Sequence, residues 1–125
     1  MKLAILLFDP DPVAARALAM QMRHAGFATY VTFDGAAAIS SARSKQFDSI
    51  VVIADLADSQ MRHFLHQIRD ADPDAWLIVI SDPPLDRARQ VVRELGGDDT
   101  MDVPFTVSDL AQRLSVLSAR ARPAA

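Results

Sequence analysis

The feature that most restricts the fold of this sequence is the alternation of strand-length apolar runs with helical patterns. Continuous apolar or β-branched runs occupy residues 3–8, 29–33, 50–54 and 76–80. Runs of this kind are typical of strands that are covered on both faces. A stretch with helical spacing follows each run, and a weaker strand is expected at residues 100–103 before a last helix. Five strand–helix units predict an α/β fold with a doubly wound parallel sheet and helices on both faces.

Local signals set the limits of the expected helices. Asp11 forms a cap before a proline at the first helical position, and Gly26 ends this first helix in a left-handed conformation. A later helix is predicted to begin at Pro84 and to end at Gly96. The stripe expected to face the core from the first helix consists of Ala14, Ala17, Leu18, Gln21, Met22 and Ala25.

Composition excludes several classes of function. The chain of 125 residues has no Cys, which rules out disulfide scaffolds and thiol catalysis. Its net charge of −3 argues against direct nucleic-acid binding by this domain. Residues 3–8 are too few to cross a bilayer, and no cleavage pattern follows them, so we expect a cytoplasmic protein without membrane contact. One domain is expected at residues 1–119, with residues 120–125 as a tail or the start of a linker.

The polar residues that follow the strands are the candidates for function, because ligands of parallel sheets bind beyond the carboxyl ends of the strands. At these ends the sequence resembles the receiver domains of bacterial two-component response regulators. The match runs without a gap from residue 2 to residue 117, and it is carried by Asp9-Pro10-Asp11-Pro12, Phe33-Asp34-Gly35, Phe47-Asp48, Ser81, Leu95-Gly96-Gly97-Asp98-Asp99 and Pro104-Phe105.

The resemblance implies a flavodoxin-like (βα)5 fold with the strand order 2-1-3-4-5 and a role in signalling. In receivers, an aspartate at the end of the third strand takes a phosphoryl group from a phosphohistidine. Two acidic residues after the first strand hold Mg²⁺, which neutralises charge on the phosphoryl oxygens. A hydroxyl after the fourth strand and a lysine before a proline bind the same group.

This sequence departs from the receiver pattern where that chemistry lies. Ile53 stands at the phosphoacceptor position, Pro10 at the second acidic position and Val103 at the lysine position. Asp9 and Ser81 remain. We therefore expect a pseudo-receiver that is not phosphorylated, is not an enzyme and needs no cofactor, with Asp9 as the metal ligand if there is any. The remnant crevice comprises Asp9, Pro10, Asp11, Ile53, Ser81, Val103 and Pro104.

The losses at Ile53 and Val103 are consistent with each other. Removing one member of a buried charged pair costs about 3–5 kcal/mol, whereas replacing both members with apolar residues is often neutral. We expect these two side chains to lie together and to extend the core. Bland roles are expected for two polar residues, Ser81 as a loop hydrogen-bond donor and Asp11 as a helix cap.

Without its phosphoryl chemistry the domain is expected to act through protein contacts, with a histidine kinase, an output domain, another regulator or a second copy as partner. The aromatic switch position of receivers is Thr100 here. By resemblance the expected interaction face comprises Arg87, Arg89, Arg93, Glu94, Thr100, Asp102, Asp109 and Arg113.

Two alternatives stay open. Asp55 lies two residues past Ile53 and keeps the same strand face, so it could replace the acceptor and work with Mg²⁺ if the third strand were longer. The altered crevice beside Ser81 could instead make the domain a sensor of a small ligand.

Overall fold

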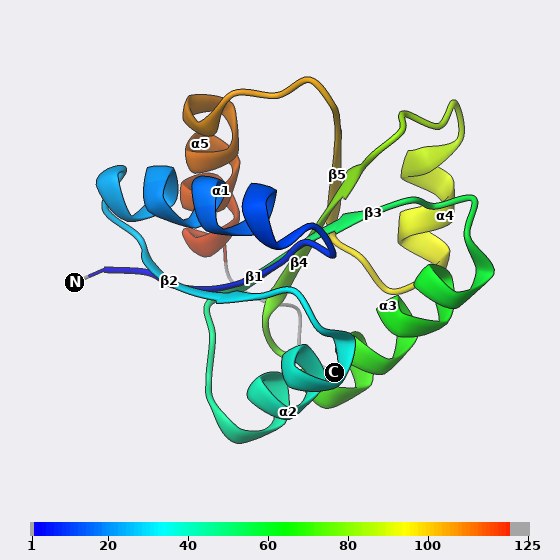
Figure 1. The fold of residues 1–125 in the computed structure, drawn as a ribbon, viewed down its shortest axis with the longest axis horizontal. Helices are drawn as coiled ribbons and strands as arrows, with labels where there is room; N and C mark the ends of the chain where they lie inside the picture. The colour runs from blue at the N-terminus through cyan, green and yellow to red at the C-terminus, as the bar shows by residue number, and fades with distance from the viewer. Residues whose placement is uncertain (1, 121–125) are drawn as a thin grey trace.

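The computed structural model describes residues 2–120, in which five strands alternate with five helices (Figure 1). All strand pairs are parallel, in the order β2-β1-β3-β4-β5. The predicted fold class and strand order are therefore confirmed. The elements are β1 Ala4–Phe8, α1 Pro12–His24, β2 Ala28–Thr32, α2 Gly35–Ser44, β3 Ser49–Ala54, α3 Ser59–Ala71, β4 Trp76–Ser81, α4 Ala88–Glu94, β5 Asp99–Asp102 and α5 Val107–Ser118.

The helices cover both faces of the sheet. Helices α1 and α5 lie on one face, and α2, α3 and α4 lie on the other (Figure 1). The central strands β3 and β4 are almost wholly buried, as their continuous apolar sequences predict. Successive side chains of a strand point to opposite faces, so each strand contributes to both cores. Leu6 and Val52 belong to the α2–α4 side, and Leu7 and Ile53 to the α1–α5 side.

The strand registers bring four residues to one level at the carboxyl edge of the sheet. Phe8 of β1 pairs with Val52 of β3, so the next residue of each chain segment, Asp9 and Ile53, lies at the same level. Ile53 pairs with Ile80 of β4, and Ile80 pairs with Met101 of β5. This level is the floor on which the remnant crevice is built.

The predicted caps are present. The Asp11 carboxylate accepts hydrogen bonds from the N–H groups of Val13 at 3.0 Å and Ala14 at 3.4 Å, at the start of α1. Gly26 follows α1 with φ +101°, a backbone conformation that favours glycine. Thr106 accepts a hydrogen bond from the Asp109 N–H and so caps α5.

The helix predicted to begin at Pro84 begins later. Helix α4 spans Ala88–Glu94, and residues 84–87 form a turn in which the Ala88 N–H donates to the Leu85 carbonyl. The two successive prolines at positions 83 and 84 restrict the backbone before this helix. A residue before proline is driven away from the helical conformation, and proline has no N–H to donate.

The stripe predicted for α1 is partly wrong. Leu18 and Met22 are buried, but the other buried positions are Ala15 and Ala19. Ala17, Gln21 and Ala25 are exposed, and Ala14 is half-buried. Alanines lie on several sides of this helix, so the hydrophobic contrast that identifies a face was too weak to separate neighbouring stripes.

The expected domain and tail meet at the end of α5. Arg120 donates its N–H to the Leu117 carbonyl just after this helix, whereas residues 121–125 of the expected tail lie outside the described residues. Within residues 2–120, no helix combines the length and the apolar character needed to cross a membrane.

Candidate functional site

An open groove of about 460 Å³ lies at the carboxyl edge of the sheet, between α1 and the segment that leads into α5. The strand ends supply its floor, and α1 and residues 103–107 supply its walls. Figure 1 shows α1 and α5 side by side on this face, with the long β5–α5 connection above them. The lining residues are Asp9, Ala14, Ala17, Leu18, Gln21, Ile53, Asp82, Val103, Phe105, Thr106 and Val107.

Ile53 and Val103 meet in this groove. Ile53 is 8% exposed and belongs to the core on the α1–α5 side, and Val103 packs against the same core. Both side chains also line the groove. The expected apolar extension of the core is present at the two positions where receivers carry an acceptor carboxylate and a lysine.

Asp9 is the buried charge-bearing residue of the groove. It is 7% exposed, and its Oδ1 accepts a hydrogen bond from the Asp11 N–H at 3.0 Å. Burial raises the pKa of the Asp9 carboxyl above its ordinary value of 3.8. The negative charges of Asp11 and Asp82 also raise this pKa, while the hydrogen bond from Asp11 opposes the rise. Within residues 2–120, no cationic side chain is paired with this carboxylate.

Ser81 has the bland role that the sequence favoured. It is fully buried, and its hydroxyl donates to the Pro83 carbonyl at 2.7 Å, so this donor is committed to the loop. The peptide bond between Val103 and Pro104 is cis. Pro10 and Pro104 are both exposed.

Few carboxylates at this edge of the sheet are available to Mg²⁺. This ion keeps several waters and is held in proteins by one or two carboxylates with a phosphate. Pro10 and Ile53 stand where the resemblance to receivers places acidic residues, which leaves the buried Asp9 and the exposed Asp82 at the groove. In the described part of the chain no three acidic, His or Cys side chains are grouped so as to hold a metal ion.

Asp55 lies outside the groove. Strand β3 ends at Ala54, which pairs with Ser81, and Asp55 follows in an exposed turn. Its carboxylate accepts a hydrogen bond from the Ala57 N–H at 3.0 Å. The register keeps Ile53, and not Asp55, at the level of Asp9.

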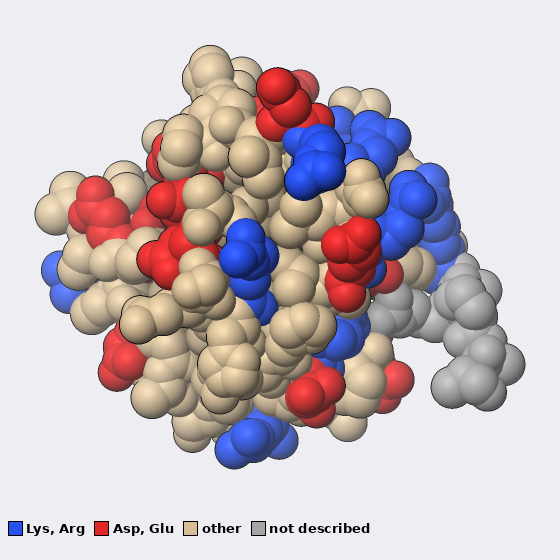
Figure 2. All heavy atoms as spheres, turned by 90° about the vertical axis from the view of Figure 1, so that its right-hand side faces the viewer, with Lys and Arg blue, Asp and Glu red and all other residues tan. Residues whose placement is uncertain are grey.

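The expected interaction face is made by α4, β5 and α5. Arg87, Arg89, Arg93, Glu94, Asp102 and Asp109 are exposed, and Thr100 and Arg113 are half-buried. Figure 2, seen from the side of α3 and α4, shows basic side chains gathered in a band along one border of the molecule. The expected interaction face is rich in charged side chains and poor in large apolar ones.

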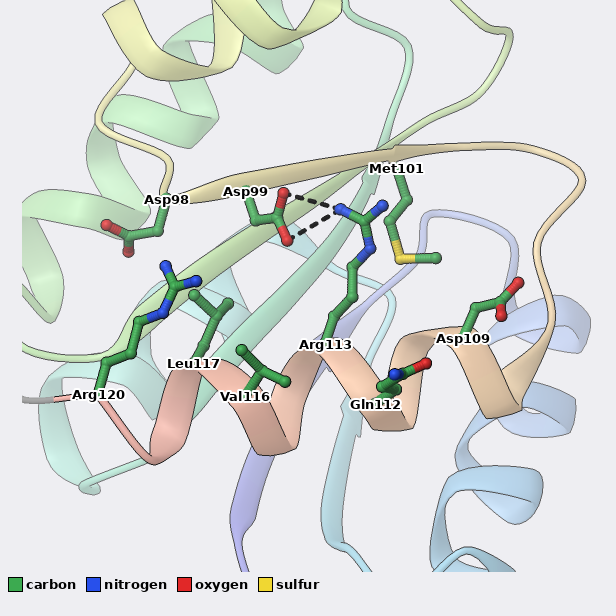
Figure 3. Close-up of a pocket in the computed structure, with 9 residues that line it drawn as sticks. All are labelled: Asp98, Asp99, Met101, Asp109, Gln112, Arg113, Val116, Leu117 and Arg120. Atoms are coloured by element: carbon green, nitrogen blue, oxygen red, sulfur yellow. Dashed lines mark hydrogen bonds and ion pairs between the residues drawn. The ribbon is translucent and has the colours of Figure 1, made fainter.

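Arg113, a member of this face, also serves the fold. Its Nη1 contacts both carboxylate oxygens of Asp99, at 2.9 and 3.0 Å (Figure 3). The same nitrogen donates to the Thr100 carbonyl. The Thr100 hydroxyl is buried and has no hydrogen-bond partner among residues 2–120. A shallow groove of about 610 Å³ between β5 and α5 runs beside this ion pair.

Sequence reasoning missed several residues of the site. Asp82, Phe105 and Val107 line the groove. Phe105 belongs to a matched motif and Val107 follows it, but their inward placement depends on the path of the β5–α5 connection. Asp99 is part of a matched motif. Its position, four residues before Val103, does not indicate that it pairs with a residue of α5.

Comparisons with known proteins bear on the same fold. No protein-family model matches the sequence. The probable transcriptional regulatory protein TcrX of Mycobacterium tuberculosis is 28% identical over 116 residues, which cover 93% of this chain and 50% of that protein. The chain thus spans about half the length of the curated relatives it matches.

Solved structures share the architecture at lower identity. A CheY-like response regulator receiver domain from Methanospirillum hungatei superposes with a TM-score of 0.82 at 14% identity, covering 94% of each chain. The receiver domain of the sensor histidine kinase PA1611 from Pseudomonas aeruginosa, which holds a magnesium ion in its active site cleft, gives 0.80 at 22% identity and covers 96% of this chain and all of that one. The chain thus has the fold of solved receiver domains, and its sequence is similar to one half of curated response regulators.

Proposed function

We propose that this receiver domain works in two-component signalling without an aspartyl phosphate, and that it acts by binding other proteins. The observation that carries the proposal is Ile53, a buried core residue at the level of Asp9 where a phosphoacceptor is expected. A hydrocarbon side chain cannot attack phosphorus. Val103 packs against the same core and supplies no cation for a phosphoryl group.

The proposal covers cofactor, activity and location as well. One buried carboxylate and a hydroxyl committed to a backbone carbonyl support a domain that functions without Mg²⁺ and without catalysis. Together with the resemblance to response regulators, they favour a cytoplasmic protein whose partners are a histidine kinase, an output domain, another regulator or a second copy.

The expected interaction face is the proposed contact surface. Arg89 and Arg93 are its best reporters, because both are exposed on α4. Arg113 is a poor reporter, since its replacement also breaks the contact with Asp99. Reversing the charge of Arg89 and Arg93 is expected to weaken partner binding without changing stability, and unchanged affinity would place the interface elsewhere.

The intact mass of the protein after incubation with acetyl phosphate and Mg²⁺ tests the central claim. We expect no added phosphoryl group. A gain of one phosphoryl group that disappears in Asp55→Asn would establish the alternative acceptor. A gain that persists in this variant would show another phosphorylation site, and either gain would refute the proposal.

A further inference from the structure

The groove between α1 and the start of α5 combines apolar walls with a charge at its inner end. Its apolar lining includes Leu18, Ile53, Val103, Phe105 and Val107. Its volume of about 460 Å³ lies within the range of sites for small organic molecules. Pockets of this kind bind an apolar body and orient it with a small number of polar groups.

The polar groups of this groove are acidic. Asp9 is more than nine-tenths buried and faces the groove, and Asp82 lines it as well. The Asp9 Oδ1 accepts the Asp11 N–H, while none of residues 2–120 donates a hydrogen bond to its Oδ2. No Lys, Arg or His is among the lining residues. The Asp9 Oδ2 is not among the enclosed polar atoms without a partner, so it is open to the groove, where a cationic group would stabilise the carboxylate.

We propose that this groove binds a small organic cation, a primary ammonium or amidinium group carried on an apolar body. The cationic head donates hydrogen bonds to the free oxygen of Asp9 and lies near Asp82. The body packs against Leu18, Phe105 and Val107. This inference does not rest on the mode of signalling proposed above, because it uses only the lining of the groove.

Other ligand classes fit the groove less well. An anion would meet Asp9 and Asp82 without a compensating cation. A divalent ion would find Asp9 and Asp82 but would leave the apolar wall of Leu18, Phe105 and Val107 without a contact, and it is a competitor in the test below. A neutral apolar ligand would cover the Asp9 carboxylate and leave it without a donor.

The test is a titration of the purified protein with 2-phenylethylammonium, followed by two-dimensional amide NMR. We expect saturable shifts at groove residues such as Leu18 and Phe105. The neutral isostere 2-phenylethanol and the anion 3-phenylpropionate should bind about tenfold more weakly or worse, because each lacks the charge-assisted hydrogen bond. Shifts of equal size with the neutral compound, or no saturable shifts with the ammonium, would overturn the proposal.

Three variants locate the site. Asp9→Asn retains an acceptor for the Asp11 N–H but removes the charge, and it should weaken ammonium binding about tenfold or more. Ala17→Trp fills the groove from an exposed position of α1 and should abolish binding without burying a new charge. Asp55→Asn, the matched control in an exposed turn, should bind like wild type. Wild-type affinity in Ala17→Trp would refute the location even if Asp9→Asn failed to fold, and displacement of the ammonium by Mg²⁺ would assign Asp9 to a metal instead.

Discussion

Restoring the receiver charges one at a time should show how completely the core has absorbed their places. Ile53→Asp puts a carboxylate at a position that is 8% exposed, at the level of the buried Asp9 and in contact with the α1–α5 core. It removes a packed hydrocarbon and adds a second buried negative charge. We expect a loss of about 3–5 kcal/mol in the free energy of unfolding, the usual cost of an uncompensated buried charge.

Val103→Lys provides the comparison. Val103 is half-buried at the groove, so the lysine can extend its ammonium toward solvent, and the single change should cost about 1 kcal/mol. In the double variant the ammonium and the new carboxylate share one groove and should attract each other. The double variant should therefore be more stable than the sum of the single effects by about 1–3 kcal/mol.

Urea unfolding followed by the fluorescence of Trp76, the single tryptophan of the chain, measures all four proteins. The m-values should agree, so that the midpoints report stability alone. Single effects that add within about 0.5 kcal/mol would refute the reasoning. Additivity would mean that the two positions do not share a low-dielectric environment.

Three further predictions concern charge and packing. Burial raises the pKa of Asp9, so its carboxylate lowers the free energy of unfolding increasingly as pH rises from 3.8 through the folded pKa. Asp9→Asn should therefore stabilise the protein at neutral pH. This gain, measured by urea unfolding, should vanish as pH falls toward 3.8. A double-mutant cycle on Asp99 and Arg113 should give a coupling of at most about 1 kcal/mol, since both side chains are partly exposed, and a clearly larger value would contradict this account. Gly97→Ala places a methyl group against a valine of α4 and should lower the free energy of unfolding by about 1–3 kcal/mol, measured by thermal or urea unfolding. Gly35→Ala, the control, meets only ordinary contacts and should be near neutral. Similar losses in both variants would be evidence against the packing explanation.

The parts of the fold that the sequence predicts well are those fixed by strong local contrast. The apolar runs at residues 50–54 and 76–80 can bury all their side chains only when both faces of the strand are covered. They form β3 and β4, the buried centre of the sheet. Asp11 and Gly26 have the residue types that favour the two ends of a helix. Asp11 caps the start of α1, and Gly26 follows its end with a positive φ.

The parts that the sequence did not predict depend on tertiary geometry. Pro84 has the right character for the first turn of a helix, but α4 begins at Ala88, and the sequence between these positions contains no signal for the later start. Phe105 lines the groove because of the path between β5 and α5. The contact of Arg113 with Asp99 joins a helix to a neighbouring strand, and neither residue type nor spacing identifies such a partner.

The same geometry explains how the fold can form with apolar residues at the strand ends where the resemblance places phosphoryl chemistry. The parallel sheet is stabilised by pairing and burial along the whole length of β1, β3 and β4, and these terms do not depend on charges at the strand ends. Ile53 adds to that burial, whereas a carboxylate there would oppose it unless a cation stood beside it. Asp9 is the exception, since it is buried without a cation in a groove that Ile53 and Val103 also line. The Asp9 carboxylate costs stability in a groove that is otherwise apolar, which is expected of a residue kept for binding. Asp9→Asn should therefore lose ammonium binding and gain stability, and both changes together would show a trade-off between function and stability.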